Sequence, residues 1–254
     1  MTGRSANPAL NKNTFKDFAL SYSESRVMTL QGTVNKILFM LLLVVLGAVY
    51  TWKIFFNAFD PVYGASSVMK WMIAGGIGGF IMALVTIFKR SWAPFTAPLY
   101  AFLEGLFLGG ISAYFEARYQ GIVFLAVTLT FGTLFTLLMA YKSGVIKPTE
   151  NFKLGIVAAT GSIFLVYLLS FILGFFGINI GFIHDNGVIG IGFSLVVVII
   201  AALNLVLDFD FIEQGAKAGA PKFMEWYAAF GLIVTLVWLY IEFLRLLSKL
   251  ASRK

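Results

Sequence analysis

Residues 188–207 read VIGIGFSLVVVIIAALNLVL, a stretch that contains no charged residue. A helix rises about 1.5 Å per residue, so this stretch can cross roughly 30 Å of hydrocarbon. The strands of an outer-membrane barrel alternate apolar and polar residues, and this stretch does not. Because lipid offers no hydrogen-bond partners, a spanning segment must satisfy its own backbone, as a helix does. The stretch therefore predicts a transmembrane helix.

Other apolar segments of similar length lie on both sides of it. The predicted spans are residues 37–56, 68–88, 93–115, 121–141, 154–178, 188–207 and 226–247. Composition agrees, because 12% of the residues are charged and a soluble domain has about a quarter. The sequence predicts an all-α, polytopic membrane protein. Its domains would be a polar or interfacial segment (1–35), a seven-helix transmembrane bundle (36–248) and a basic tail (249–254).

Cysteine and histidine are nearly absent. The chain has no cysteine and a single histidine, His184, which excludes disulfides and thiolate sites and argues against zinc, haem and triad chemistry. We therefore predict a chain that is not an enzyme, with no cofactor and no fixed metal. The net charge of +7 does not predict nucleic-acid binding, because no soluble face carries a basic stripe. The polar residues before the first span are also unlike a signal peptide.

The distribution of basic residues predicts the orientation. With the N-terminus in the cytoplasm, twelve basic residues lie inside: Arg4, Lys12, Lys16, Arg26, Lys36, Lys89, Arg90, Lys142, Lys147, Lys153, Lys217 and Lys222. Three lie outside, namely Lys53, Lys70 and Arg118. This bias favours a multi-pass protein of the cell (inner or plasma) membrane with a cytoplasmic N-terminus. The C-terminal charges, from Arg245 onward, break the pattern. Either the seventh segment spans fully with its charged tail outside, as we favour, or it is re-entrant or lies partly in the interface.

Glycines at GxxxG spacing occur in two spans. Gly75 and Gly79 lie in the second, and Gly105 and Gly109 in the third. Small residues at this spacing allow two helices to approach closely in lipid. We predict ordinary bundle packing at these positions and assign them no function.

Glu104 lies at the midpoint of the third span. An ionised acid at the centre of a bilayer costs about 2.5 to 3.5 kcal/mol, so Glu104 should face the bundle interior or a wet cavity. Two interpretations stay open. It is either a functional acid or a protonated hydrogen-bond donor between helices.

More acids lie at the ends of the last two spans. Asp208 and Asp210 follow the sixth span and point in different directions if helical, with Asn204 one turn before Asp208. We expect Asp210 and Glu213 to lie in an interfacial loop. An EF-hand loop is excluded, because Glu213 occupies its glycine position. In the seventh span, Glu242 has Arg245 three residues later as a potential ion-pair partner.

These residues resemble the Bax-inhibitor family, the transmembrane Bax inhibitor motif proteins, and its bacterial branch in particular. The third-helix pattern YAFLEGLFLG (100–109) is similar to that of the family, as is the opening SANPALN (5–11). Asp208 matches the family's aspartate at the end of the sixth helix, and Glu242 matches its aspartate in the seventh. The resemblance covers nearly the whole chain.

The resemblance implies a pH-sensitive cation leak that passes calcium, gated by protonation of intramembrane carboxylates. Asp208 and Glu242 would form the cation-binding and pH-sensing site, with Glu104 as a further candidate and Asn204, Asp210 and Arg245 in support. Like charges held close together bind a proton more readily, and carboxylates suit a transient calcium ion at Asp208. This sequence has glutamate at 242 and no basic residue within 71–88 to serve as the family's latch.

The spacing between the two acids raises a difficulty. With a turn near Gly219, Asp208 and Glu242 would differ by about twelve residues along the hairpin, or roughly 18 Å. The two acids would then meet only across a break in a helix or an interfacial stretch, and otherwise Glu104 becomes the better candidate.

Two alternative functions stay open. The chain could be a non-catalytic regulator that binds other membrane proteins, docking through an N-terminal segment that contains Phe15, Phe18 and Leu20. It could also be an intramembrane aspartyl protease, although the expected G-x-G-D signature is missing, since Val206 and Leu207 precede Asp208. The partners expected from the sequence are thus the lipid bilayer, calcium ions and protons, with other membrane proteins as the alternative.

Overall fold

A computed structural model describes residues 27–58, 61–177 and 185–253. Within them lie the helices α2 (Leu30–Phe56), α3 (Pro61–Phe88), α4 (Ala93–Arg118), α5 (Ile122–Lys142), α6 (Glu150–Phe175), α8 (Val188–Lys217) and α9 (Met224–Ala251). A 3-10 turn, η3 (Arg90–Trp92), joins α3 to α4. All seven α-helices are long and apolar enough to span a membrane, which confirms the predicted seven-helix fold.

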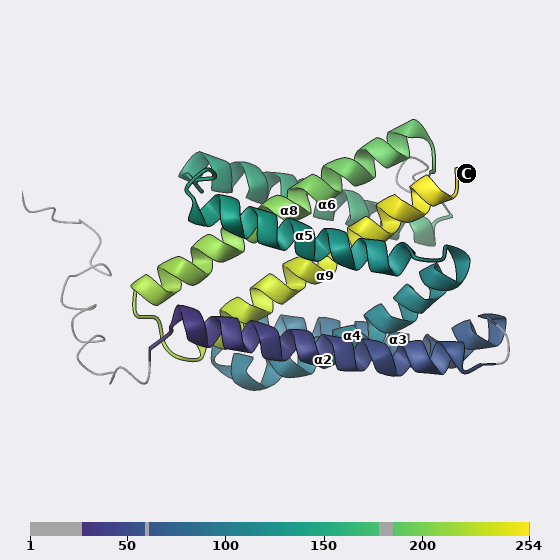
Figure 1. Cartoon of the computed structure of the whole chain (residues 1–254), viewed down its shortest axis with the longest axis horizontal. Coiled ribbons are helices and arrows are strands. Elements are labelled where there is room, and N and C mark those ends of the chain that lie inside the picture. The colour runs from purple at the N-terminus through teal and green to yellow at the C-terminus, as the bar shows by residue number, and fades with distance from the viewer. Residues whose placement is uncertain (1–26, 59–60, 178–184, 254) are drawn as a thin grey trace, which may run out of the picture.

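The last helix occupies the centre of the bundle. In Figure 1, α9 (yellow) crosses between the α5 and α8 pair and the α2, α3 and α4 group. It packs against α2, α4, α5 and α8. Its face toward them includes the fully buried Ile233 and Leu239. A full-length seventh helix agrees with the interpretation that this segment spans rather than re-enters.

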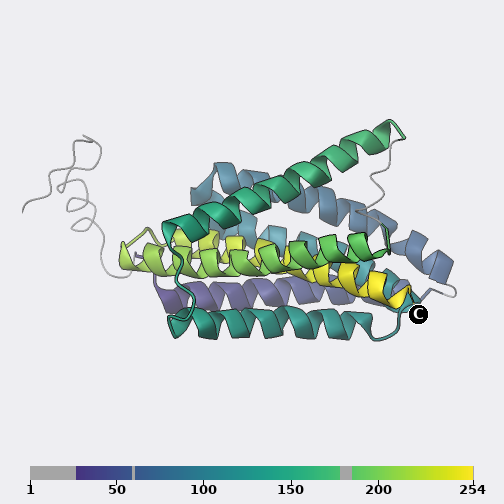
Figure 2. The ribbon, with the colours of Figure 1, turned by 90° about the horizontal axis from the view of Figure 1, so that it is seen from above.

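Helix α6 lies at the periphery. It packs mainly against α8 and diverges from it toward its own C-terminal end, as Figure 2 shows. Its outer face is strongly apolar, with Leu154, Phe171 and Phe175 largely exposed. In a membrane this face is available to acyl chains, because none of the described residues covers it.

Helices α2, α3 and α4 approach each other through glycines. A Cβ added at Gly105 of α4 would collide with the backbone of Val44 in α2. A Cβ at Gly75 of α3 would lie 2.5 Å from the carbonyl oxygen of Leu103 in α4. Both glycines belong to the GxxxG pairs, which confirms the predicted close helix packing.

A buried ion cluster joins the beginnings of α2 and α9. The Glu225 side chain is fully buried and accepts hydrogen bonds from the backbone N–H and the hydroxyl of Thr29, both at 2.9 Å. Lys36 pairs with its second oxygen at 2.6 Å, and Lys222 with the first at 2.8 Å. The hydrogen bonds and ion pairs of this cluster offset the desolvation cost of burying the Glu225 carboxylate. The sequence analysis did not identify it.

Several helices extend further than the apolar pattern predicted, and α2 and α9 are two of them. Helix α2 begins at Leu30 rather than residue 37, because the Thr29 hydroxyl caps its first turn by accepting from the N–H of Gly32 at 3.0 Å. Residues 30–35 therefore belong to the bundle, while the rest of the proposed N-terminal segment, except residues 27–29, lies outside the described residues, as do Phe15, Phe18 and Leu20. Lys249, predicted to start the basic tail, lies within α9.

The prediction of an interfacial loop after the sixth span was wrong. Helix α8 continues to Lys217, so Asp210 and Glu213 are helical. Pairs one turn apart stabilise this extension: Gln214 donates to Asp210 at 2.6 Å, and Lys217 pairs with Glu213. Apolarity alone underestimates the length of such a helix, because the residues of its last turns are polar and bond to polar partners.

Candidate functional site

Helices α8 and α9 form an antiparallel pair with a regular register. The carboxylate of Asp208 lies against Gly231 and beside the Thr235 hydroxyl, which donates to the Gly231 carbonyl at 3.3 Å. Four turns further along α9, the Lys249 ammonium donates to the Gly190 carbonyl at 3.0 Å and to the Ser194 hydroxyl at 2.9 Å. At each of these contacts, the number of the α8 residue and the number of its neighbour on α9 add to 439 or 443. A constant sum means that the antiparallel register does not shift along the pair.

One face of α9 carries the polar residues of this contact. Positions 231, 235, 238, 242, 245 and 249 are spaced by three or four residues and so share a helical face. We call the polar contacts along it the polar seam, which consists of Asp208, Thr235, Glu242, Arg245, Lys249, Ser194 and Tyr167. The seam runs from the middle of the bundle to the C-terminal end of α9.

Asp208 occupies the inner end of the seam. Its Oδ2 atom is buried and has no hydrogen-bond partner within the described part of the chain. The other side of the carboxylate has the Thr235 hydroxyl. A carboxylate at this depth with only one hydroxyl beside it is incompletely satisfied, which is costly in a membrane interior.

Glu242 lies further along the seam in a closed network. The residue is 1% exposed. Arg245 donates to its two oxygens at 2.8 and 3.1 Å, and the Tyr167 hydroxyl lies 3.2 and 3.3 Å from them. Arg245 also donates to the Tyr167 hydroxyl and lies over the Tyr167 ring, 5.0 Å from its centroid. The predicted Glu242–Arg245 pair is confirmed, and Tyr167 of α6 is an additional member.

The two seam carboxylates do not meet. Asp208 lies beside Gly231 and Thr235, which precede Glu242 by eleven and seven residues, so the acids are separated by roughly 10 to 16 Å along an unbroken α9. The offset is smaller than the predicted 18 Å. The turn spans residues 218–223, so its midpoint lies beyond Gly219. Moving the midpoint by one residue along the chain lengthens the α8 arm and shortens the α9 arm by one residue each, which reduces the axial offset between the two acids by two residues. An aspartyl-protease pair needs its two acids in contact, and these two are not.

The remaining polar residues of α8 have partners outside the seam. Asn204 donates to Thr160 of α6 and to the Ile200 carbonyl, both at 2.8 Å, rather than to Asp208. Asp210 pairs with Lys153 of α6 at 2.9 Å. Glu213 accepts from Tyr141 of α5 at 2.5 Å. These contacts tie neighbouring helices to α8.

Glu104 lies on the other side of the bundle, between α4 and α3. Its Oε2 would be 2.9 Å from a Cβ at Gly79, so the carboxyl occupies the space that this glycine leaves. Within the described part of the chain it makes no hydrogen bond or ion pair. The structure therefore separates Glu104 from Asp208 and Glu242.

Two basic residues near the C-terminus are engaged within the protein. Lys249 is 4% exposed, and Arg245 pairs with Glu242. Lys249, Thr235 and Tyr167 were not among the residues predicted for the site. Lys249 and Thr235 could have been found from their three- and four-residue spacing around Glu242. Tyr167 had no such signal, because the crossing of α6 and α9 is a tertiary contact.

Comparison with known proteins places the chain in a family. A family model described as Bax inhibitor 1 like matches residues 7–252. The chain belongs to this family. No curated protein matches it. Family membership and the seven spans together make this Bax inhibitor 1-like chain a multi-pass membrane protein.

The seam does not form a preorganised metal site. Among the described residues, no three histidine, cysteine, aspartate or glutamate side chains lie together as potential metal ligands. A cation at Asp208 would rely on one carboxylate and on neighbouring hydroxyl or carbonyl oxygens.

Proposed function

We propose that this chain is a cation leak, permeable to calcium, in which the polar seam lines the path and protonation of its carboxylates controls conduction. The observation that carries the proposal is Asp208, a buried carboxylate with an oxygen that lacks a partner among the described residues. Intramembrane acids of this kind mark ion pathways. When Asp208 loses its proton, a passing cation supplies the countercharge that the protein does not.

Glu242 has a different role in the proposal. Its charge is neutralised by Arg245, and Tyr167 connects the pair to α6. Protonation of Glu242 removes the ion pair and weakens the attachment of α6 to α9. Because α6 otherwise packs mainly on α8, this network is a suitable latch for the outer end of the path.

The experiment measures calcium entry into proteoliposomes across roughly pH 6 to 8, because like charges and burial change the proton affinity of carboxylates. We expect wild-type flux to depend on pH. Asp208→Asn should lower the flux, because the attracting charge is lost. Glu242→Gln should raise it and flatten its pH dependence, because the latch stays open at every pH.

Glu213→Gln is the matched control. Glu213 lies on the same helix as Asp208 but outside the seam, so this change should leave flux and pH dependence unchanged. Glu104→Gln tests the other candidate acid. If Glu104→Gln abolishes flux and Asp208→Asn does not, the path lies between α3 and α4 and the seam proposal is wrong. Flux that is absent, or indifferent to pH and to every change, rejects the leak altogether.

Orientation and membrane belong to the same proposal. We place the N-terminus in the cytoplasm and the chain in the cell membrane, from the bias of basic residues toward one end of the bundle. A non-catalytic regulator that binds membrane proteins is the alternative. It predicts unchanged flux but loss of a co-purifying partner when residues 1–26 are removed.

A further inference from the structure

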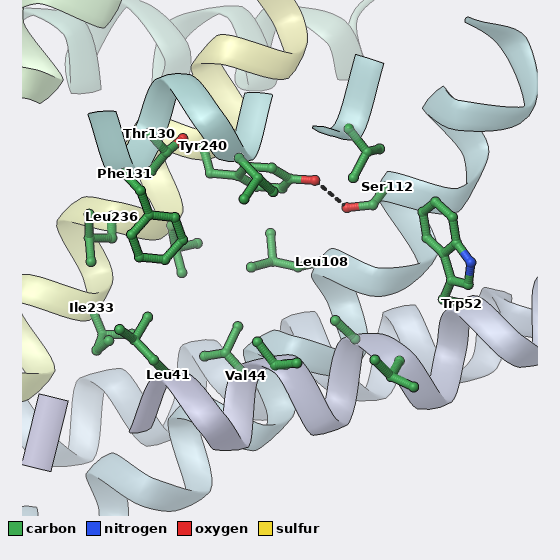
Figure 3. A pocket seen from close by; sticks show the side chains of 16 residues that line it. Leu41, Val44, Trp52, Leu108, Ser112, Thr130, Phe131, Ile233, Leu236 and Tyr240 are labelled. Atoms are coloured by element: carbon green, nitrogen blue, oxygen red, sulfur yellow. Dashed lines mark hydrogen bonds between the residues drawn. The ribbon is translucent and has the colours of Figure 1, made fainter. Parts of the chain in front are cut away.

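A cavity lies between α2, α4, α5 and α9, on the opposite side of α9 from the seam. Its volume is about 250 Å³. The close-up in Figure 3 shows Leu41 and Val44 of α2, Leu108 of α4 and Phe131 of α5 around the open space. An engineered apolar cavity of about 150 Å³ already binds benzene, so this one has room for a longer hydrocarbon.

The cavity wall carries few polar groups, and most of them bond within the protein. Ser112 and Tyr240 hydrogen-bond each other at 2.6 Å across its wall, as Figure 3 shows. The Thr130 hydroxyl donates to the Ala126 carbonyl within its own helix at 2.8 Å. The other lining residues are apolar except for the indole N–H of Trp52, whose nitrogen lies on the side of the ring away from the open space in Figure 3. Such a lining selects a ligand that needs no hydrogen bonds.

The depth of the cavity determines what surrounds it. Val45, Leu108, Val127 and Leu236 lie within about five residues of the midpoints of their helices, or roughly 8 Å along the axes. In a chain that spans a bilayer, this level is the hydrocarbon centre, where neither water nor headgroups are present.

The cavity is continuous with the lipid-facing surface. Val45 and Val49 of α2 are 53% and 45% exposed, and Val127 of α5 is 39% exposed, so these three residues form a mouth between α2 and α5. Leu108 and Leu236, by contrast, are 5% and 4% exposed and form the floor. A lipid chain beside α2 and α5 can therefore enter without crossing any polar group.

We propose that this cavity is a binding site for an acyl chain of a bilayer phospholipid, inserted between α2 and α5. The inserted chain contacts Leu108 and Leu236, which lipids that merely surround the bundle do not reach. It also contacts the α9 face next to Tyr240 and fills space that would otherwise lack packing partners. The proposal is independent of whether the chain conducts ions.

The test uses the full chain in phosphatidylcholine vesicles that contain a photoactivatable phosphatidylcholine. In one arm the diazirine is in the middle of an acyl chain, and in the other it is on the headgroup. After illumination, mass spectrometry locates the adducts. We expect adducts on Leu108 or Leu236 from the acyl-chain probe only. Adducts confined to exposed residues, or equal floor labelling from the headgroup probe, would overturn the proposal.

Two matched substitutions on α5 sharpen the result. Val127→Trp places a large ring in the mouth and should remove most of the floor adducts. Leu125→Trp adds the same ring two residues away, where Leu125 is 46% exposed and does not line the cavity, so floor labelling should persist. Equal floor labelling in both variants contradicts an entry between α2 and α5. If Val127→Trp fails to fold, the wild-type adduct map alone decides the proposal.

Discussion

The α2–α3–α4 group and the α6–α8–α9 group are held together by different means. In the first group glycines bring backbones into direct contact, as at Gly105 against Val44 and Gly75 against Leu103. In the second, α6 is attached through polar ties at three levels, from Lys153–Asp210 through Thr160–Asn204 to Tyr167 with Glu242. Both strategies are known for helices in lipid, where apolar burial gives little preference for protein over acyl chain.

The difference indicates where motion and function belong. A backbone contact at a glycine is either made or lost and has no protonation state. A polar tie that contains a carboxylate can change with pH while the helices stay intact. The pathway proposed here therefore belongs to the polar group, and the glycine group is expected to behave as a fixed frame.

Gly105→Ala should have the largest effect on stability. Its methyl group would overlap the backbone of Val44, which cannot move aside as a flexible side chain can, so the free energy of unfolding should fall by about 2 kcal/mol or more. Unfolding in mixed micelles by increasing fractions of sodium dodecyl sulfate measures the change.

Gly132→Ala is the control for this substitution. Nothing lies within 4 Å of a Cβ at Gly132 of α5, so alanine should be neutral or stabilise the helix by about 0.5–1 kcal/mol. Equal losses for the two variants would show that glycine contacts are not what holds α2 to α4.

Tyr167→Phe should have an intermediate effect, directed at the polar group. The change removes the hydroxyl that joins Glu242 and Arg245 to α6, and the free energy of unfolding should fall by about 1 kcal/mol. Hydrogen exchange of the α6 amides in nanodiscs should accelerate while that of α2 and α4 does not.

Tyr50→Phe removes a hydroxyl of the same kind in the glycine group. Tyr50 is 45% exposed and contacts Trp71 through its ring, which phenylalanine retains. The variant should match wild type in stability and exchange. If Tyr167→Phe also leaves α6 exchange unchanged, the network at Glu242 is not a latch, and the gating role proposed for it fails.

The spans and the glycine contacts could be predicted from the sequence because both depend on local patterns. An apolar run of about twenty residues and a four-residue spacing of glycines are visible without any tertiary information. The Glu242–Arg245 pair was equally predictable, since one turn of a helix separates the two residues.

The rest of the site depends on register between helices. Thr235 lies beside Asp208 although it is 27 positions further along the chain, and the axial offset between Asp208 and Glu242 follows from where the α8–α9 turn is centred. The end of α8 was misplaced for a related reason. Asp210 and Glu213 have the composition of a loop, but Lys153 and Tyr141 on other helices stabilise them as helix.

The C-terminal charges illustrate the same limit. Counting basic residues treats each one as exposed at a membrane surface, and on that count Arg245 and Lys249 contradict the pattern. In the fold, Arg245 pairs with Glu242, and Lys249 donates to the first turns of α8. Basic residues that pair with other residues inside the protein carry little information about orientation. The count of basic residues is therefore better made without them.

Thr160→Val should have the smallest effect of the three changes in stability. It removes the hydrogen bond from Asn204, and interhelical bonds of this type in membranes contribute about 0.6 kcal/mol. Asn204 keeps its second partner, the Ile200 carbonyl, so the amide is not left unsatisfied.

Thr128→Val is the control, since the Thr128 hydroxyl bonds only its own helix, at the Phe124 carbonyl. A loss for Thr160→Val as large as that for Tyr167→Phe would mean that the ties to α6 act as one cooperative unit. In that case α6 would detach along its whole length when Glu242 is protonated, rather than pivot about its N-terminal half, and the gate would extend from the outer end of the seam to Asp208.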